Sequence, residues 1–308
     1  MLSLPDARAR LRGVIVPTVT PFDDQGRLDL PAFRDLLDFL ARQGASAVVP
    51  GDLVGEMFAL TLKERRVLLE EAVAACRGRM LAVALTAAAS VEDAIELARF
   101  ARDVGADAIK ISLPYPWTPT AAGMLDVFRR IDDAAQMPFL LESSDDLTIP
   151  VEVIDALCER PTFVGIEEFG SSASRADRIY GDFAERLVIL TSGDNASLCL
   201  GLMGAPGMVV AESNFAPRQI AEFLEASRER KLDRALELFR ARRRYRDLFR
   251  DALSRGLPMF VPYTKAALEL MGLRVGRPRP PQEPLGEIER EVLRETLHSS
   301  FGIETPAP

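Results

Sequence analysis

The chain has 308 residues, of which 48% are hydrophobic and 27% are charged, a composition typical of a globular protein with an apolar core. This length fits two ordinary domains or one large α/β barrel. The net charge of −8 argues against nucleic acid or an anionic membrane surface as a partner. No apolar stretch approaches the roughly 20 residues that a membrane-spanning helix needs.

The cysteines and the N-terminal residues both predict a cytoplasmic protein. Cys76, Cys158 and Cys199 are far apart, and the first two lie in helical patterns, so we expect free thiols in a reducing compartment. The N-terminal residues show no apolar run before their arginines, so we expect no secretory signal.

Short apolar runs alternate with segments of helical period. Strands are expected at 13–22, 46–51 and 80–87, followed by helices at 30–45, 61–78 and 90–105. The second helix begins with Thr61 and Glu64, the spacing of a capping box. Five more strands are expected at 106–114, 137–144, 163–170, 187–193 and 207–213, most of them separated by helical segments at 122–136, 150–160, 174–186 and 196–203.

Eight alternating units predict an α/β fold, specifically a (β/α)8 barrel rather than an open sheet. No glycine-rich nucleotide-binding loop follows a strand. From residue 216 the pattern is helical apart from a proline-rich loop. We therefore expect residues 1–215 to form the barrel core, and residues 216–308 to form its last helix and a C-terminal helical segment of the same structural unit.

Several motifs in order resemble one family. They are "VTPF" (19–22), "GE" (55–56), "GADAIKISLPY" (105–115), "SGD" (192–194) and "GAPGMVVAESNFAP" (204–217). Together they resemble the dihydrodipicolinate synthase / N-acetylneuraminate lyase family. The resemblance implies a (β/α)8 barrel with C-terminal helices that assembles as a homotetramer or homodimer. It also implies aldolase-type chemistry on a 2-oxo acid, commonly pyruvate, through a lysine Schiff base.

The positions that carry this chemistry in the family are changed here. The resemblance implies the Schiff-base lysine at Glu167 and the proton-relaying tyrosine at Glu142. It places the carboxylate-binding threonine pair at Leu53 and Val54. Of a tyrosine pair it implies after the fourth strand, only Tyr115 remains. A carboxylate cannot form an imine, so residue 167 cannot perform the family's usual step.

Acidic residues follow five of the expected strands and would form an acidic rim at one end of the barrel: Asp52, Glu142, Glu167, Asp194 and Glu212. Clustered carboxylates repel one another and need a cation. Strand alternation turns Lys110 toward the barrel interior and Ile109 and Ile111 outward. Two interpretations stay open: Lys110 and Glu167 form a structural ion pair, or Lys110 is a relocated amine nucleophile with Glu167 or Glu142 as its acid/base.

The predicted catalytic residues are therefore Glu167, Glu142 and Lys110. The predicted substrate-binding residues are Asp52, Ser143, Tyr115, Gly193 and Glu212. No cofactor is expected, although carboxylates alone would suit Mg²⁺. The only histidine, His298, lies near the end of the chain, which disfavours histidine-based metal sites or triads.

Three functions follow from these residues. The first is a diverged lyase acting on a small 2-oxo or 2-hydroxy acid, with an amine or guanidinium group to match the acidic rim. The second is a non-catalytic, ligand-binding family member. The third is a carboxylate- or magnesium-assisted lyase or hydratase. A filled site would favour the second, and an open pocket would favour the first.

Overall fold

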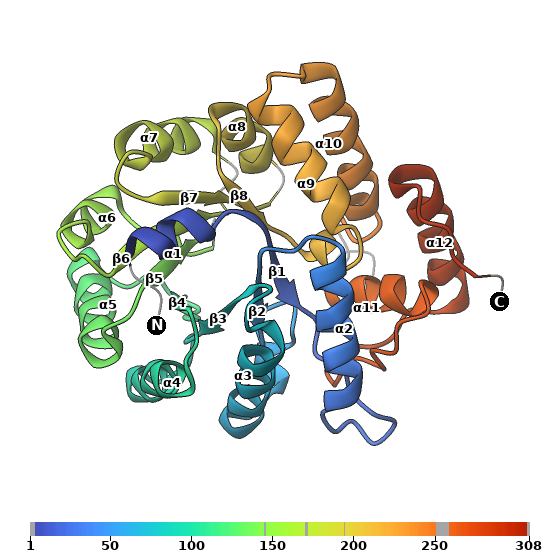
Figure 1. Ribbon diagram of the computed structural model, residues 1–308, viewed down its shortest axis with the longest axis horizontal. Coiled ribbons are helices and arrows are strands. Elements are labelled where there is room, and N and C mark those ends of the chain that lie inside the picture. The colour runs from blue at the N-terminus through green and yellow to red at the C-terminus, as the bar shows by residue number, and fades with distance from the viewer. Residues whose placement is uncertain (1–3, 145, 170–171, 194, 251–258, 307–308) are drawn as a thin grey trace.

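The structure, a computed structural model, describes residues 4–144, 146–169, 172–193, 195–250 and 259–306. Eight parallel strands form a closed barrel in chain order, which confirms the predicted (β/α)8 fold (Figure 1). The strands are β1 Gly13–Thr18, β2 Ala47–Pro50, β3 Leu81–Leu85, β4 Ala108–Ile111, β5 Phe139–Ser143, β6 Phe163–Glu168, β7 Val188–Thr191 and β8 Gly207–Val209.

Helices surround the barrel on its outer side (Figure 1). They are α1 Leu4–Arg10, α2 Leu30–Arg42, α3 Leu62–Cys76, α4 Val91–Val104, α5 Ala121–Ala135, α6 Val151–Leu157, α7 Ala173–Phe183, α8 Asn195–Met203, α9 Pro217–Arg228, α10 Leu232–Asp247, α11 Phe260–Leu270 and α12 Glu287–Phe301. Two short 3₁₀ turns, η1 Met57–Ala59 and η2 Ala211–Asn214, follow β2 and β8. Within the described residues, no helix is both long and apolar enough to cross a membrane.

Local sequence signals set the helix boundaries. The Thr61 side chain accepts a hydrogen bond from the Glu64 amide, and the Glu64 carboxylate accepts one from the Thr61 amide. This is the predicted capping box at the start of α3. Ser90 likewise caps α4, which ends at Gly105 in the left-handed region.

The strands are shorter than the apolar runs that predicted them. The second strand, for example, ends at Pro50, so Asp52 lies in the loop beyond it. Along β4, Ala108 belongs to the apolar cluster inside the barrel, whereas Ile109 and Ile111 belong to the cluster between strands and helices. The predicted alternation is therefore correct, and the Lys110 side chain points into the barrel.

The short helix α1 was not predicted, because its sequence LPDARAR has no apolar period. It lies across the N-terminal end of the barrel (Figure 1). Leu11, which follows it, is fully buried in the interior cluster. The helix therefore closes the end of the barrel opposite the acidic rim.

The helical run after residue 216 is divided between α9 and α10. Helix α9 packs against β1 and β8 as the last barrel helix, and α10 packs on α9 and α12 (Figure 1). The C-terminal segment is tied to the loop after β2 by Glu56, whose carboxylate contacts Lys265 Nζ at 2.7 Å and accepts a hydrogen bond from the Arg279 amide at 2.7 Å. Glu56 and Lys265 thus form a buried pair outside the barrel interior.

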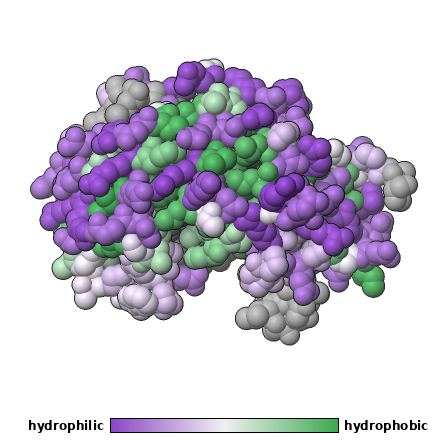
Figure 2. Space-filling model, turned by 90° about the horizontal axis from the view of Figure 1, so that it is seen from below, coloured by the Kyte–Doolittle hydropathy of each residue, from purple (hydrophilic) through white to green (hydrophobic). Residues whose placement is uncertain are grey.

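Figure 2 shows hydrophobic side chains gathered along the middle of one face of the molecule, bordered by hydrophilic side chains. This is the lower side in Figure 1, where α3 and α4 lie. Apolar surface of this kind is common at contacts between proteins. The assembly into a homotetramer or homodimer stays a prediction.

Candidate active site

Four charged side chains meet at the C-terminal end of the barrel, where enzymes of this architecture carry their chemistry. Asp52 follows β2, Lys110 belongs to β4, Glu142 to β5 and Glu167 to β6. Parallel strands deliver their C-terminal ends to one edge, so these distant positions in the sequence become neighbours.

The Lys110 ammonium lies at the centre of the group. Its Nζ is 2.6 Å from Asp52 Oδ2, 2.6 Å from Glu142 Oε2 and 3.0 Å from Glu167 Oε2. The Lys110 side chain is only 2% exposed. We call these four residues the lysine cluster. Sequence reasoning had paired Lys110 with Glu167 and Glu142, and the structure adds Asp52 as a third partner.

Strand register explains the convergence. Glu142 pairs directly with Glu167 across β5 and β6, and Lys110 is level with Leu140. Lys110 therefore starts two residues below Glu142 along the barrel axis. Its long side chain spans that height and places the ammonium between the carboxylates.

The charges of the cluster are strongly coupled. Burial by itself would lower the pKa of Lys110, but the three carboxylates outweigh it and raise this pKa well above its ordinary value. The three carboxylates thus favour the ammonium form of Lys110, which is not a nucleophile. Burial raises the pKa of Glu167 to about 7, against the opposing effect of Lys110 and with additional repulsion from Glu142 and Asp52. Glu167 can therefore gain or lose a proton near neutral pH.

Arg65 is a second buried cation near the lysine cluster, and the sequence analysis did not select it as a site residue. It lies on α3, is 8% exposed, and donates hydrogen bonds to the carbonyls of Leu85 and Ala87 at the end of β3. Burial lowers its pKa to about 10, and the Asp52 carboxylate opposes that shift. The sequence could have indicated that Arg65 is buried, because Arg65 has helical spacing from Leu68, Leu69 and Ala72 and so lies on the same buried face of α3.

Glu142 is the accessible member of the cluster. Its side chain is 23% exposed, whereas those of Asp52 and Glu167 are 6% and 5% exposed. Its second oxygen lies 3.3 Å from the Ser112 hydroxyl. A ligand that reaches Lys110 from solvent therefore meets Glu142 first.

Ser143 was predicted to bind substrate, but its side chain lies on the outer side of the barrel, away from the lysine cluster. It follows Glu142 in β5 and so faces the outer side of the barrel, as Phe139 and Leu141 do. Its hydroxyl accepts hydrogen bonds from the Arg175 guanidinium and the Ile149 amide. Ser143 therefore helps to anchor the loops outside the barrel.

Glu212 also lies away from the cluster, contrary to the prediction. It belongs to η2, and its Oε1 lies 3.6 Å from Arg242 Nε and 3.3 Å from Arg246 Nε. Both arginines come from α10, on the outside of the barrel. Asp194 lies outside the described residues. Three of the other rim carboxylates share the single Lys110 ammonium, and a cationic group on the substrate stays a prediction.

Tyr115 and Gly193 stand in loops at the same end of the barrel. The Tyr115 ring stacks on Trp117, with ring centroids 5.4 Å apart. Gly193 adopts the left-handed region and lies against Phe169. Neither residue has a described contact with the lysine cluster, so their substrate-binding roles stay predictions.

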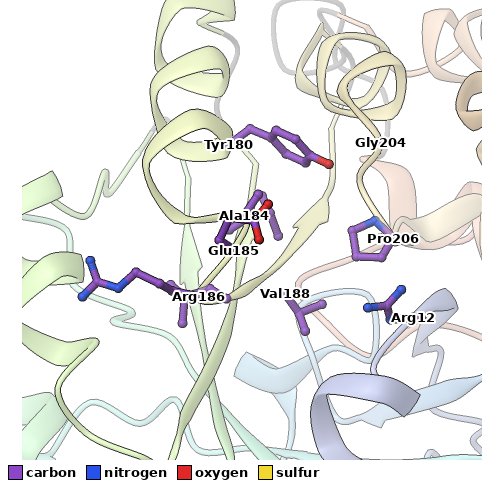
Figure 3. A pocket seen from close by; sticks show the side chains of 10 residues that line it. Arg12, Tyr180, Ala184, Glu185, Arg186, Val188, Gly204 and Pro206 are labelled. Atoms are coloured by element: carbon purple, nitrogen blue, oxygen red, sulfur yellow. The ribbon is translucent and has the colours of Figure 1, made fainter. Parts of the chain in front are cut away.

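The point where the three carboxylates converge is taken by the Lys110 ammonium. Among the residues that the structure describes, no group of three or more His, Cys, Asp and Glu side chains is arranged to hold a metal ion. A pocket of about 270 Å³ opens at the N-terminal end of the barrel, where Arg12, Tyr180, Glu185 and Pro206 line it (Figure 3). In barrels of this kind, chemistry belongs to the opposite end.

A family model for the dihydrodipicolinate synthetase family matches residues 10–300. The chain belongs to this family. It is 30% identical to 4-hydroxy-tetrahydrodipicolinate synthase of Pseudomonas putida (strain W619), with 94% of this chain and 98% of that protein covered. It is 34% identical to the synthase of Phenylobacterium zucineum (strain HLK1), with 92% and 95% covered.

Solved structures agree with this assignment. The dihydrodipicolinate synthase DapA-2 of Bacillus anthracis superposes with a TM-score of 0.86 at 27% identity, covering 94% of this chain and 98% of that one. Proteus mirabilis N-acetylneuraminate lyase superposes with a TM-score of 0.84 at 22% identity, which shows the shared fold.

Proposed function

We propose that the chain is a lyase of this family that acts on a small 2-oxo or 2-hydroxy acid without an imine intermediate. The observation that carries the proposal is the lysine cluster: a buried ammonium beside a carboxylate whose pKa lies near neutrality. The named relatives are synthases of the same barrel, which supports lyase chemistry at this end of the fold.

Each group in the cluster has a chemical role in this proposal. A 2-oxo acid enters past Glu142, and its carbonyl oxygen takes the place of the Glu142 carboxylate at the Lys110 ammonium. The Glu167 carboxylate removes a proton from the carbon next to the carbonyl. The electron pair moves onto the carbonyl oxygen, and the ammonium stabilises the resulting enolate.

Cleavage follows the same path with a different proton. In a 4-hydroxy-2-oxo acid, Glu167 takes the proton of the C4 hydroxyl, the bond between C3 and C4 breaks, and C4 leaves as an aldehyde. The bonding electrons form the enolate at Lys110, and Glu167 returns its proton to carbon to give the 2-oxo acid. Because Nζ and Glu167 Oε2 are 3.0 Å apart, one small substrate reaches both groups.

Deuterium exchange tests the proton-transfer step directly. Pyruvate is incubated with the protein in D₂O, and loss of its methyl signal is followed by ¹H NMR. We expect exchange above the buffer rate, and none with Glu167→Gln. The matched control is Glu283→Gln, an exposed glutamate far along the chain, which should exchange normally. Wild-type exchange that survives in Glu167→Gln would contradict the proposed base.

Borohydride reduction in the presence of pyruvate tests the absence of an imine. Peptide mass spectrometry should find no reduced adduct on Lys110, because the ammonium has no free electron pair. An adduct on Lys110 would instead establish a relocated aldolase lysine.

A non-catalytic, ligand-binding role is the second candidate, and one observation favours it. All three carboxylate partners of Lys110 come from the chain itself, so the site is satisfied without a ligand. This alternative expects pyruvate binding with no exchange in the wild-type protein.

A further inference from the structure

Large apolar side chains are exposed in the loops after three of the four strands, β2, β4 and β6, that carry or precede the residues of the lysine cluster. Leu53 after β2 is 47% exposed, Trp117 after β4 is 64% exposed, and Phe169 after β6 is 47% exposed. Single exposed apolar residues are ordinary. Leu53, Trp117 and Phe169, however, lie at the same end of the barrel as the buried lysine cluster, and we call these three residues the apolar mouth.

Phe169 is the best-defined member of the apolar mouth. Its amide donates to the Ser143 carbonyl at 2.8 Å, so the strand geometry of β6 continues to this residue. Strand alternation then places its side chain on the same side as Glu167. A Cβ at Gly193 would lie 3.8 Å from the Phe169 ring, so the ring lies beside the loop that follows β7.

Leu53 stands directly beside the cluster. It follows Asp52, and the Asp52 carboxylate accepts a hydrogen bond from the Leu53 amide at 2.6 Å. In the loop after β4, Trp117 stacks nearly parallel to Tyr115, with a 10° interplanar angle. The three residues follow β2, β4 and β6, whose C-terminal ends lie at the same end of the barrel as the Lys110 ammonium.

We propose that the apolar mouth makes the enzyme selective for 2-oxo acids that carry an aryl or branched alkyl substituent. This inference rests on the proposed function, because the lysine cluster holds the 2-oxo acid end. The cluster's carboxylates are already paired with Lys110, so the rest of the substrate gains affinity through apolar contact. Phe169 is the specificity-determining residue with the clearest placement.

Paired ligands measure this selectivity. Pyruvate and 2-oxo-4-phenylbutanoate share the 2-oxo acid end and differ by a benzyl group on the pyruvate methyl carbon, and isothermal titration calorimetry gives both dissociation constants. We expect the phenyl compound to bind at least about tenfold more tightly. Phe169→Ala should remove most of that difference, so that the ratio of the two dissociation constants falls toward one. The matched control is Ile288→Ala, which removes a 79% exposed apolar side chain from α12 and should change neither constant.

Two results would overturn the inference. One is equal affinity for the two ligands, or a phenyl preference that Phe169→Ala retains. The other is a change in sedimentation velocity with Phe169→Ala, which would assign the side chain to a contact between subunits. The exchange assay separates this inference from the proposed function. Exchange with no phenyl preference refutes only the apolar mouth, whereas a phenyl preference without exchange refutes only the lyase chemistry.

Discussion

Replacing Lys110 with methionine removes the cation that holds the cluster together. Methionine keeps most of the volume and apolar length of the side chain, so the change acts mainly on charge. Three carboxylates within 3.0 Å of the ammonium would then face one another without a counter-charge. Removing one partner of a buried ion pair typically costs about 3–5 kcal/mol, and we expect the free energy of unfolding to fall by this amount.

The loss should depend on pH in a defined direction. Lys110 lowers the pKa of Glu167, so its removal raises that pKa further above the ordinary value. A carboxyl group with a raised folded-state pKa stabilises the protein at low pH and loses that contribution as pH rises. The deficit of Lys110→Met relative to wild type should therefore be small near pH 4 and largest above pH 7.

Urea denaturation followed by circular dichroism, at pH 4.5 and pH 8, measures both effects. The matched control is Lys265→Met, which removes another buried lysine whose carboxylate partner is Glu56. It should lose stability and leave the titration of Glu167 unchanged. The double variant Lys110→Met/Glu167→Gln should recover part of the loss, because one repelling charge is gone. Equal stability of Lys110→Met and wild type at pH 8 would refute the reasoning.

Four further outcomes are expected. Glu167→Gln should flatten the pH dependence of stability between about pH 4.5 and 8. The raised pKa of Glu167, about 7, corresponds to about 3 kcal/mol of folding free energy lost across this range in the wild-type protein. An unchanged slope in urea titrations would contradict this prediction. Glu142→Gln removes a charge that raises the pKa of Glu167, so the pH profile of deuterium exchange should move toward acid, and an alkaline shift would count against the cluster geometry. Glu167→Lys should not restore condensation of pyruvate with aspartate semialdehyde, because residues 53, 54 and 142 also differ from those the resemblance implies; rescue in a coupled assay would show that the other changes matter little. Thr61→Ala should cost about 1 kcal/mol through loss of the α3 cap, and a neutral result in urea would mean that Glu64 holds the helix start without it.

The fold could be predicted from the sequence because its signals are local and repeated. Eight apolar runs, each followed by a helical pattern, leave few topologies besides a (β/α)8 barrel. The direction of Lys110 was also determined locally, since a strand alternates its faces with a period of two residues. The capping box at Thr61 involves only the four residues from Thr61 to Glu64 and needs no tertiary contact. Helix α1 was not predicted, because its polar sequence has no helical period of apolar residues.

The site depended on contacts between strands that a single sequence does not specify. Alternation gives the face of a residue but not its height on the barrel or its nearest neighbour. Glu142 and Ser143 are adjacent in the sequence, yet one contacts Lys110 and the other anchors Arg175 outside the barrel. The sequence places Glu212 after the eighth strand, as expected for a rim residue, but in the structure it lies beside two arginines of α10. Only the tertiary structure decides such pairings, because a buried charge takes whichever partner the packed strands and helices bring within a few ångströms.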